Sequence, residues 1–186
     1  MTANSRETET STGRATWAER LRRRFSLGGL LRGVAEGLVI AAVVLLALQW
    51  LGGDRIKRGT PAPNLRLRTL AGQTVDLAAF KGQTVIVEFW APWCKVCRWQ
   101  VGALNDLFDA KRAVILSVAL DYRSHDQVRR FVGEHGVRYP VLLGGRQTSS
   151  EFRVDQFPTI YVIDEAGRIT HSRSGYTPGW LLRFWL

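Results

Sequence analysis

The longest apolar segment of the sequence covers residues 33–53, and Glu36 and Gln49 are its only strongly polar side chains. A helix needs about 20 residues to cross the hydrocarbon core of a bilayer. The segment is apolar on all sides, which argues against a helix buried along one stripe in a globular core. Trp50 lies near one end, where an aromatic residue suits a membrane interface. The pattern predicts one transmembrane helix, interpreted as an uncleaved signal anchor because no small-x-small cleavage site follows it.

Residues 1–32 precede this segment and form a polar, basic leader. Residues 1–16 are rich in Thr and Ser, which predicts disorder. Residues 17–32 place apolar side chains at helical spacing among arginines, which fits either an amphipathic helix on an anionic membrane surface or a solvated leader. Within 20 residues of the apolar segment, six basic residues precede it and five follow it. The positive-inside rule therefore leaves the orientation open.

Residues 54–64 are linker-like and end in GTPAPN, and a folded domain is expected over residues 65–186. Residues 65–77 alternate between apolar and polar positions around a glycine, which predicts a β-hairpin. Further strands are expected over residues 84–89, 113–120, 159–164 and 168–175. Helices are expected over residues 94–111 and 124–136, with a last short helix that has Thr177 as N-cap and Pro178 as first residue. Strands alternating with helices predict an α/β sandwich.

The formal net charge of +10 is shared equally between the two parts of the chain. Residues 1–58 carry 10 Lys and Arg against 5 Asp and Glu, and residues 59–186 carry 16 against 11. A basic chain can bind nucleic acid, but the arginines are scattered and no groove-reading motif is present. We therefore expect no nucleic-acid partner.

The only two cysteines, Cys94 and Cys97, are separated by two residues. A disulfide between them closes a loop too short to stabilise the fold appreciably, so the pair points to redox chemistry or to a metal. At the start of a helix, free N–H groups and the helix dipole favour a thiolate at Cys94. Cys97 is expected one turn further, on the same face and less exposed. The spacing predicts that Cys94 attacks a disulfide and that Cys97 resolves the mixed disulfide.

Glu88 is the one acidic residue in the apolar run before the cysteines. If it faces the helix on a buried strand, burial raises its pKa, and its carboxylate can accept the proton of Cys97 during resolution. The alternative is an edge position that faces solvent. We favour the first interpretation because a charged residue in a buried strand needs a chemical reason.

The segment FWAPWCKVC resembles the WCxxC active site of thioredoxin-like proteins, and Phe157-Pro158-Thr159 resembles their cis-proline loop. The resemblance implies a thioredoxin-like sandwich with a central mixed sheet and flanking helices. It also implies that Trp93 and the 157–159 loop frame the substrate groove, that the Phe157–Pro158 bond is cis, and that no organic cofactor is needed.

Residues 59–186 and the apolar segment are similar to membrane-anchored TlpA/ResA-type proteins, and the C-terminal residues 167–186 resemble the suppressor-of-copper-sensitivity D (ScsD-like) branch. The resemblance implies an inner-membrane anchor, a cytoplasmic leader and a periplasmic domain. It also implies protein thiols and disulfides as substrates, a membrane electron donor of DsbD type, and a reducing direction. The dipeptide between the cysteines is Lys-Val, where thioredoxin has Gly-Pro, and this dipeptide influences the reduction potential.

Two other functions remain open from the sequence. The domain could act as a disulfide-forming oxidant, or it could bind copper or zinc without catalysis, since paired cysteines suit soft metals. A closed zinc site requires four ligands, and the three histidines, His125, His135 and His171, are scattered along the chain. We therefore expect no metal site. The residues before Cys94 are Ala-Pro-Trp, which lack the Thr-x-x-Cys pattern of a peroxidase.

Overall fold

The computed structural model describes residues 27–51 and 56–186, with side chains described from residue 32 to residue 45 in the first of these ranges. The chain divides into two compact units, Met1–Leu51 and Gly52–Leu186. The predicted disorder of residues 1–16 lies outside the described residues, as does most of the predicted basic segment over residues 17–32.

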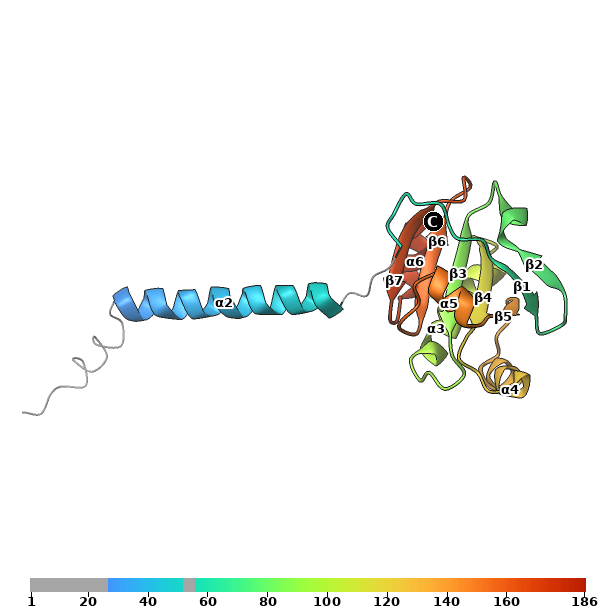
Figure 1. Cartoon of the computed structure of the whole chain (residues 1–186), viewed down its shortest axis with the longest axis horizontal. Coiled ribbons are helices and arrows are strands. Elements are labelled where there is room, and N and C mark those ends of the chain that lie inside the picture. The colour runs from blue at the N-terminus through green and yellow to red at the C-terminus, as the bar shows by residue number, and fades with distance from the viewer. Residues whose placement is uncertain (1–26, 52–55) are drawn as a thin grey trace, which may run out of the picture. The chain divides into compact units, whose positions relative to one another are not determined.

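The first unit contains helix α2 (Leu27–Leu51), a continuous helix of 25 residues (Figure 1). Arg32 and Glu36 form an exposed i,i+4 ion pair with 3.7 Å between Nε and Oε1. Among the residues that the structure describes, no helix is both long enough and apolar enough to span a bilayer. The transmembrane helix over residues 33–53 therefore stays a prediction.

The second unit is built on a mixed seven-stranded sheet with the order β2-β1-β5-β4-β3-β6-β7 (Figure 1). The central strands β3, β4 and β5 run parallel to one another, and β1, β2, β6 and β7 pair antiparallel to their neighbours. The strands are β1 (Arg66–Thr69), β2 (Thr74–Asp76), β3 (Val85–Trp90), β4 (Val114–Ala119), β5 (Val141–Leu143), β6 (Thr159–Ile163) and β7 (Ile169–Ser174).

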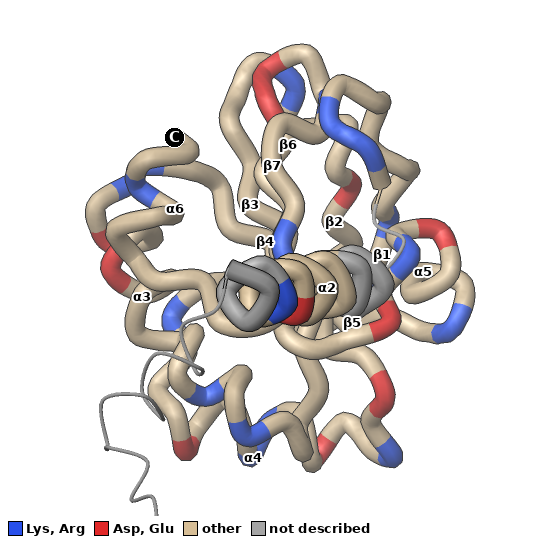
Figure 2. Tube along the Cα trace, turned by 90° about the vertical axis from the view of Figure 1, so that its left-hand side faces the viewer, with Lys and Arg blue, Asp and Glu red and all other residues tan. Residues whose placement is uncertain are grey.

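Helices cover both faces of this sheet. The helices are α3 (Cys97–Asp109), α4 (His125–His135), α5 (Arg146–Glu151) and α6 (Gly179–Trp185), with a 3-10 helix, η1 (Leu77–Phe80), after the first hairpin. Apolar side chains of α3, α4 and α6 pack on one face. Side chains of η1 and of the segment that follows α5 pack on the other. Charged positions lie mostly around the periphery of the domain (Figure 2).

The predicted α/β sandwich is confirmed, with differences at the helix ends. The hairpin turns at Gly72, with φ of +83°, and α4 ends at Gly136, with φ of +62°, a conformation that favours glycine. Helix α3 begins at Cys97, whereas the sequence predicted a start at Cys94. Helix α6 begins at Gly179 with Pro178 as N-cap, so the predicted N-cap at Thr177 is wrong.

The chain joins the sheet before residue 65. The Gly59 amide donates to the carbonyl of Ile169 at 2.7 Å, the Ile169 amide donates to the carbonyl of Thr60 at 2.9 Å, and the Ala62 amide donates to Gly167 at 2.9 Å. Part of the predicted linker over residues 54–64 thus lies along β7. It covers backbone groups that an edge strand would otherwise leave unpaired.

Candidate active site

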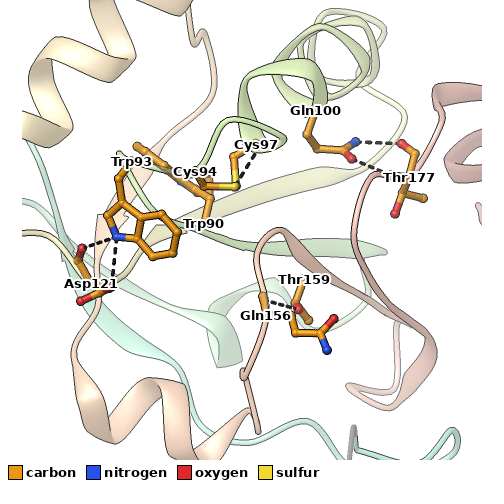
Figure 3. The surroundings of a disulfide bond; sticks show 10 residues. Trp90, Trp93, Cys94, Cys97, Gln100, Asp121, Gln156, Thr159 and Thr177 are labelled. Atoms are coloured by element: carbon orange, nitrogen blue, oxygen red, sulfur yellow. Dashed lines mark hydrogen bonds between the residues drawn. A yellow bond between two sulfur atoms is a disulfide. The ribbon is translucent and has the colours of Figure 1, made fainter. Parts of the chain in front are cut away.

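The two cysteines lie between the carboxyl end of β3 and the start of α3, where they form a disulfide (Figure 3). The Cα atoms of Cys94 and Cys97 are 5.4 Å apart. Cys94 is 6% exposed and Cys97 is 1% exposed, which confirms that Cys97 is the inner residue of the pair. Cys97 is the first residue of α3, so it does not lie one turn inside the helix as predicted.

The helix start acts on the outer sulfur directly. The backbone N–H of Cys97 donates a hydrogen bond to Sγ of Cys94 at 3.2 Å. This amide is one of the N–H groups that an α-helix leaves without an intrahelical partner, and it lies at the positive end of the helix dipole. After reduction, both effects favour the thiolate of Cys94 over its thiol.

Trp93 stands at the surface beside the disulfide, with 62% of its area exposed. Its indole Nε1 donates to Oδ2 of Asp121 at 3.0 Å and to the carbonyl of the same residue at 3.2 Å (Figure 3). Its ring packs edge-on against Phe157, with 5.7 Å between ring centroids. These contacts hold a large exposed aromatic ring in one orientation. Asp121 was not predicted, because it follows a strand 28 residues further along the chain.

The loop that precedes β6 has the predicted backbone geometry. The Phe157–Pro158 peptide bond is cis. The carbonyl of Pro158 accepts from the Gly175 amide at 2.7 Å, and the hydroxyl of Thr159 donates to the Gln156 carbonyl at 2.8 Å. Phe157 packs against the buried cluster that contains both cysteines, which places this loop next to the disulfide. The 157–159 segment and the cysteine pair therefore belong to one site.

Glu88 is buried at 2% exposure, so the alternative of a solvent-facing edge position is wrong. Its neighbours on the same side of β3 are Ile86 and Trp90, which pack with side chains of α3. Glu88 therefore lies on the sheet face that α3 covers. Oε2 of Glu88 accepts a hydrogen bond from the Ser117 hydroxyl at 2.9 Å. Burial raises the pKa of Glu88 to about 8, even though hydrogen bonds from Ser117 and Tyr139 act in the opposite direction.

A buried polar network connects Glu88 to the cysteine cluster. The indole Nε1 of Trp90 donates to the Ser117 hydroxyl at 2.7 Å, and that hydroxyl donates onward to Glu88. The Trp90 ring stacks on Phe131 at 4.2 Å and belongs to the cluster of Cys94 and Cys97. Tyr139 is also in contact with Glu88, and burial together with this carboxylate raises the Tyr139 pKa. The roles of Trp90, Ser117 and Tyr139 were not predicted, although Trp90 lies in the FWAPWCKVC segment, because strand register and loop packing bring these residues together.

The C-terminal segment is fixed to α3 immediately after the cysteines. The side-chain amide of Gln100 donates to the carbonyl of Thr177 at 2.9 Å and accepts from its amide at 2.8 Å (Figure 3). Gln100 is fully buried, so both of its polar atoms are satisfied inside the protein. This two-point contact holds the start of α6 against α3.

The three histidines lie far from one another in the fold. His125 and His135 are the first and last residues of α4, and His171 lies in β7, where its ring stacks on Trp185. Within the described part of the chain, no group of three or more His, Cys, Asp or Glu residues is arranged to hold a metal ion.

Comparisons with known proteins agree with this geometry. The thioredoxin-like protein YneN of Bacillus subtilis is 33% identical over 118 residues, which cover 61% of this chain and 69% of that protein. The thiol-disulfide oxidoreductase ResA of Bacillus thuringiensis is 30% identical over 125 residues, which cover 66% and 72%. A solved thiol:disulfide interchange protein of the thioredoxin family from Chlorobium tepidum superposes with a TM-score of 0.59 and 25% identity, covering 70% of this chain and 95% of that one.

The domain therefore has the thioredoxin-like fold that the sequence pattern resembles, with a mixed sheet and flanking helices. The model of the AhpC/TSA family matches residues 58–172, which include both cysteines, Glu88 and the cis-proline loop. Since this match covers more than half of the sequence, the chain belongs to the AhpC/TSA family.

Proposed function

We propose that this chain is a membrane-tethered thiol–disulfide oxidoreductase that exchanges disulfides with periplasmic proteins in the reducing direction. The observation that carries the activity is the Cys94–Cys97 disulfide, which lies at a helix start beside the cis-proline loop. Relatives named thiol-disulfide oxidoreductases support the same reaction class.

The reduced chain transfers two electrons to a substrate disulfide. The Cys94 thiolate attacks one substrate sulfur, and the other substrate sulfur leaves and takes up a proton. The thiol of Cys97 then loses its proton and attacks Sγ of Cys94 in the mixed disulfide. This second step releases the substrate as a dithiol and leaves the Cys94–Cys97 disulfide in the chain. A membrane electron donor of DsbD type would return the pair to the dithiol.

The reducing direction is supported by the resemblance to anchored TlpA/ResA-type proteins and by the moderate local field around the sulfurs. A strong oxidant stabilises its reduced form by holding the attacking thiolate in a very favourable field. Here the helix-start amide and the adjacent Lys95 favour a thiolate at Cys94. Burial raises the pKa of Glu88 to about 8, so this carboxyl is mostly protonated at neutral pH and its ionisation opposes the Cys94 thiolate only at higher pH. Because one amide hydrogen bond and one adjacent lysine stabilise the thiolate only moderately, we infer an intermediate to reducing potential.

Equilibration of the full chain with glutathione buffers measures the reduction potential directly. We expect a reduction potential for the Cys94–Cys97 couple below about −180 mV. The ratio of dithiol to disulfide is read by alkylation and mass spectrometry after acid quenching. A potential near about −120 mV would contradict the reducing direction and assign the chain to disulfide formation.

The proposed membrane tether is supported by the apolar segment over residues 33–53 and by the continuity of helix α2. A helix of 25 residues is about 37 Å long, which exceeds the roughly 30 Å of a bilayer core. A periplasmic position for the domain, with residues 1–32 in the cytoplasm, follows from the resemblance to anchored TlpA/ResA-type proteins.

Cell fractionation tests the tether. We expect the full chain to sediment with membranes and to resist carbonate extraction, because a spanning helix is released only by detergent. Protease added to spheroplasts should digest the domain while a cytoplasmic marker protein stays intact. Recovery of a shorter soluble species would show instead that the apolar segment is cleaved.

A further inference from the structure

A polar cleft of about 630 Å³ lies directly beside the active-site tryptophan. One wall is formed by Pro92, Trp93 and Arg98 of the cysteine motif and the start of α3. The opposite wall is formed by residues of α4 and of the loop before it. The cleft therefore opens next to the residue that precedes Cys94, within reach of a polypeptide bound at the disulfide.

Three arginines from different places in the chain line this cleft. Arg98 lies in the first turn of α3, Arg123 in the loop before α4, and Arg130 in the middle of α4. Within the described residues, none of the three guanidinium groups has a hydrogen-bond or ion-pair partner, and all three residues are exposed. Basic positions on and beside α4 are visible in Figure 2.

Other arginines on and after α4 do have acidic partners. Arg129, next to Arg130 in the sequence, pairs with Asp126 at 2.7 Å. Arg138 pairs with Asp109 on α3. The lack of acidic partners is therefore specific to the arginines of the cleft. It does not reflect a general shortage of acidic groups around α4.

The acidic groups of the cleft do not neutralise it. The Asp121 carboxylate accepts the indole hydrogen bond of Trp93, and Glu134 is the other acid in the lining. Three positive charges thus face two negative ones, of which one is already hydrogen-bonded. Phe131 is buried behind these groups, and its ring packs edge-on against His135 with 4.5 Å between centroids. The cleft combines an apolar base with several free guanidinium donors.

We propose that this cleft binds an acidic side chain of the polypeptide substrate, a few residues from the cysteine that reacts with Cys94. A guanidinium group presents a planar set of donors that matches a carboxylate in two-point geometry. Since Trp93 borders both the disulfide and the cleft, an extended substrate reaches the arginines within a few residues at about 3.3 Å per residue. This inference rests on the proposed function and adds a substrate class to it: proteins with Asp or Glu near the target cysteine.

Two synthetic peptides that differ only in charge test the proposal. Each carries one cysteine as a mixed disulfide with 2-thiopyridine, flanked on both sides by Glu and Asp in one peptide and by Gln and Asn in the other. The reduced full chain in detergent attacks the peptide sulfur through Cys94 and releases 2-thiopyridone, whose absorbance gives the rate. Cys97 then displaces the peptide as a thiol, and the chain ends as the disulfide.

We expect the acidic peptide to react about five- to tenfold faster at low salt, a preference that should shrink at high ionic strength. Arg130→Ala and Arg123→Ala should each lower this preference at least about twofold and leave the rate with the amide peptide unchanged. Arg129→Ala is the matched control, because its removal subtracts the same charge from α4 outside the cleft, and it should keep the preference.

Equal rates with the two peptides in the wild-type chain would overturn the proposal. An equal loss of preference in Arg129→Ala and Arg130→Ala would also overturn it, since the effect would then come from overall charge. A wild-type chain that reacts with the amide peptide no faster than its Cys94→Ser variant would contradict the proposed function itself, and with it this inference. The amide peptide therefore separates the two kinds of failure.

Discussion

Replacement of Cys97 by Ser is expected to convert the chain into a trap that accumulates mixed disulfides with its substrates. The attacking sulfur of Cys94 keeps its helix-start position in this variant, because only the side chain of residue 97 changes and the amide that donates to Sγ remains. The substrate is released when the inner sulfur attacks Sγ of Cys94. Because Cys97 is only 1% exposed, an external thiol cannot easily approach from the same side and take over this attack. Multiple turnover should fall by more than about a thousandfold, as it does when a nucleophile is removed.

The matched variant, Cys94→Ser, should lose turnover to the same extent and trap nothing. Membranes are prepared from cells that express each variant, quenched with acid and alkylated. Non-reducing gels then compare the high-mass adducts, and a Cys94→Ser/Cys97→Ser double variant gives the background. Adducts should appear only with Cys97→Ser and should disappear on reduction. Alkylation of the reduced wild-type chain gives an independent check. If Cys97 were the faster-reacting thiol at neutral pH, the two roles would be reversed.

The parts of this site that are local in sequence could be predicted from the sequence. The strand–cysteine–helix order of residues 84–111 follows from a β-branched run followed by apolar residues at helical spacing, and the structure has β3 and α3 there. The cis-proline loop came from the FPT segment through a family resemblance, since no rule of composition marks a cis bond. The helix start was predicted three residues early because Lys95 and Val96 are compatible with a helix but form a turn here.

The long-range part of the site could not be predicted. Glu88 meets Ser117 because β3 and β4 pair in parallel with these two residues in register, and no signal in one sequence fixes that register. Asp121 follows the end of β4 by two residues, and the same pairing of β3 with β4 brings it next to Trp93. The short elements β5 and α5 were missed because three and six residues are too few to show a period. The arginine cleft likewise combines positions that are scattered in sequence.

The buried carboxyl of Glu88 makes the stability of the folded chain depend on pH. Its pKa is about 8 in the folded chain and 4.5 in the unfolded one. Between these values the folded state binds more protons than the unfolded state, so the free energy of unfolding falls as pH rises from about 4.5 to about 8. The loss is on the order of a few kcal/mol. Glu88→Gln keeps the shape and the hydrogen-bonding oxygen, so its denaturant midpoint should lack this decline.

The same variant is expected to slow the resolution of the mixed disulfide by about a hundredfold, the usual contribution of a well-placed general base. A carboxylate with a pKa of about 8 is well matched to accept a proton from a thiol, whose ordinary pKa is about 8.5. The Glu88 carboxylate accepts hydrogen bonds from Ser117 and Tyr139. Proton transfer from Cys97 to Glu88 therefore requires a relay such as one water molecule.

Single-turnover release of a peptide from a preformed Cys94 mixed disulfide, followed from pH 6 to pH 9, separates this role from a structural one. In the wild-type chain the rate should rise with pH and level off above about pH 8, where Glu88 is ionised. In Glu88→Gln that inflection should be absent, and the rate should keep rising with hydroxide concentration. Ser117→Ala removes the hydrogen bond to Glu88 together with the acceptor of the Trp90 indole, so it should raise the Glu88 pKa and move the inflection to higher pH. Identical pH profiles in Glu88→Gln and the wild type would show that the carboxyl group only supports the fold.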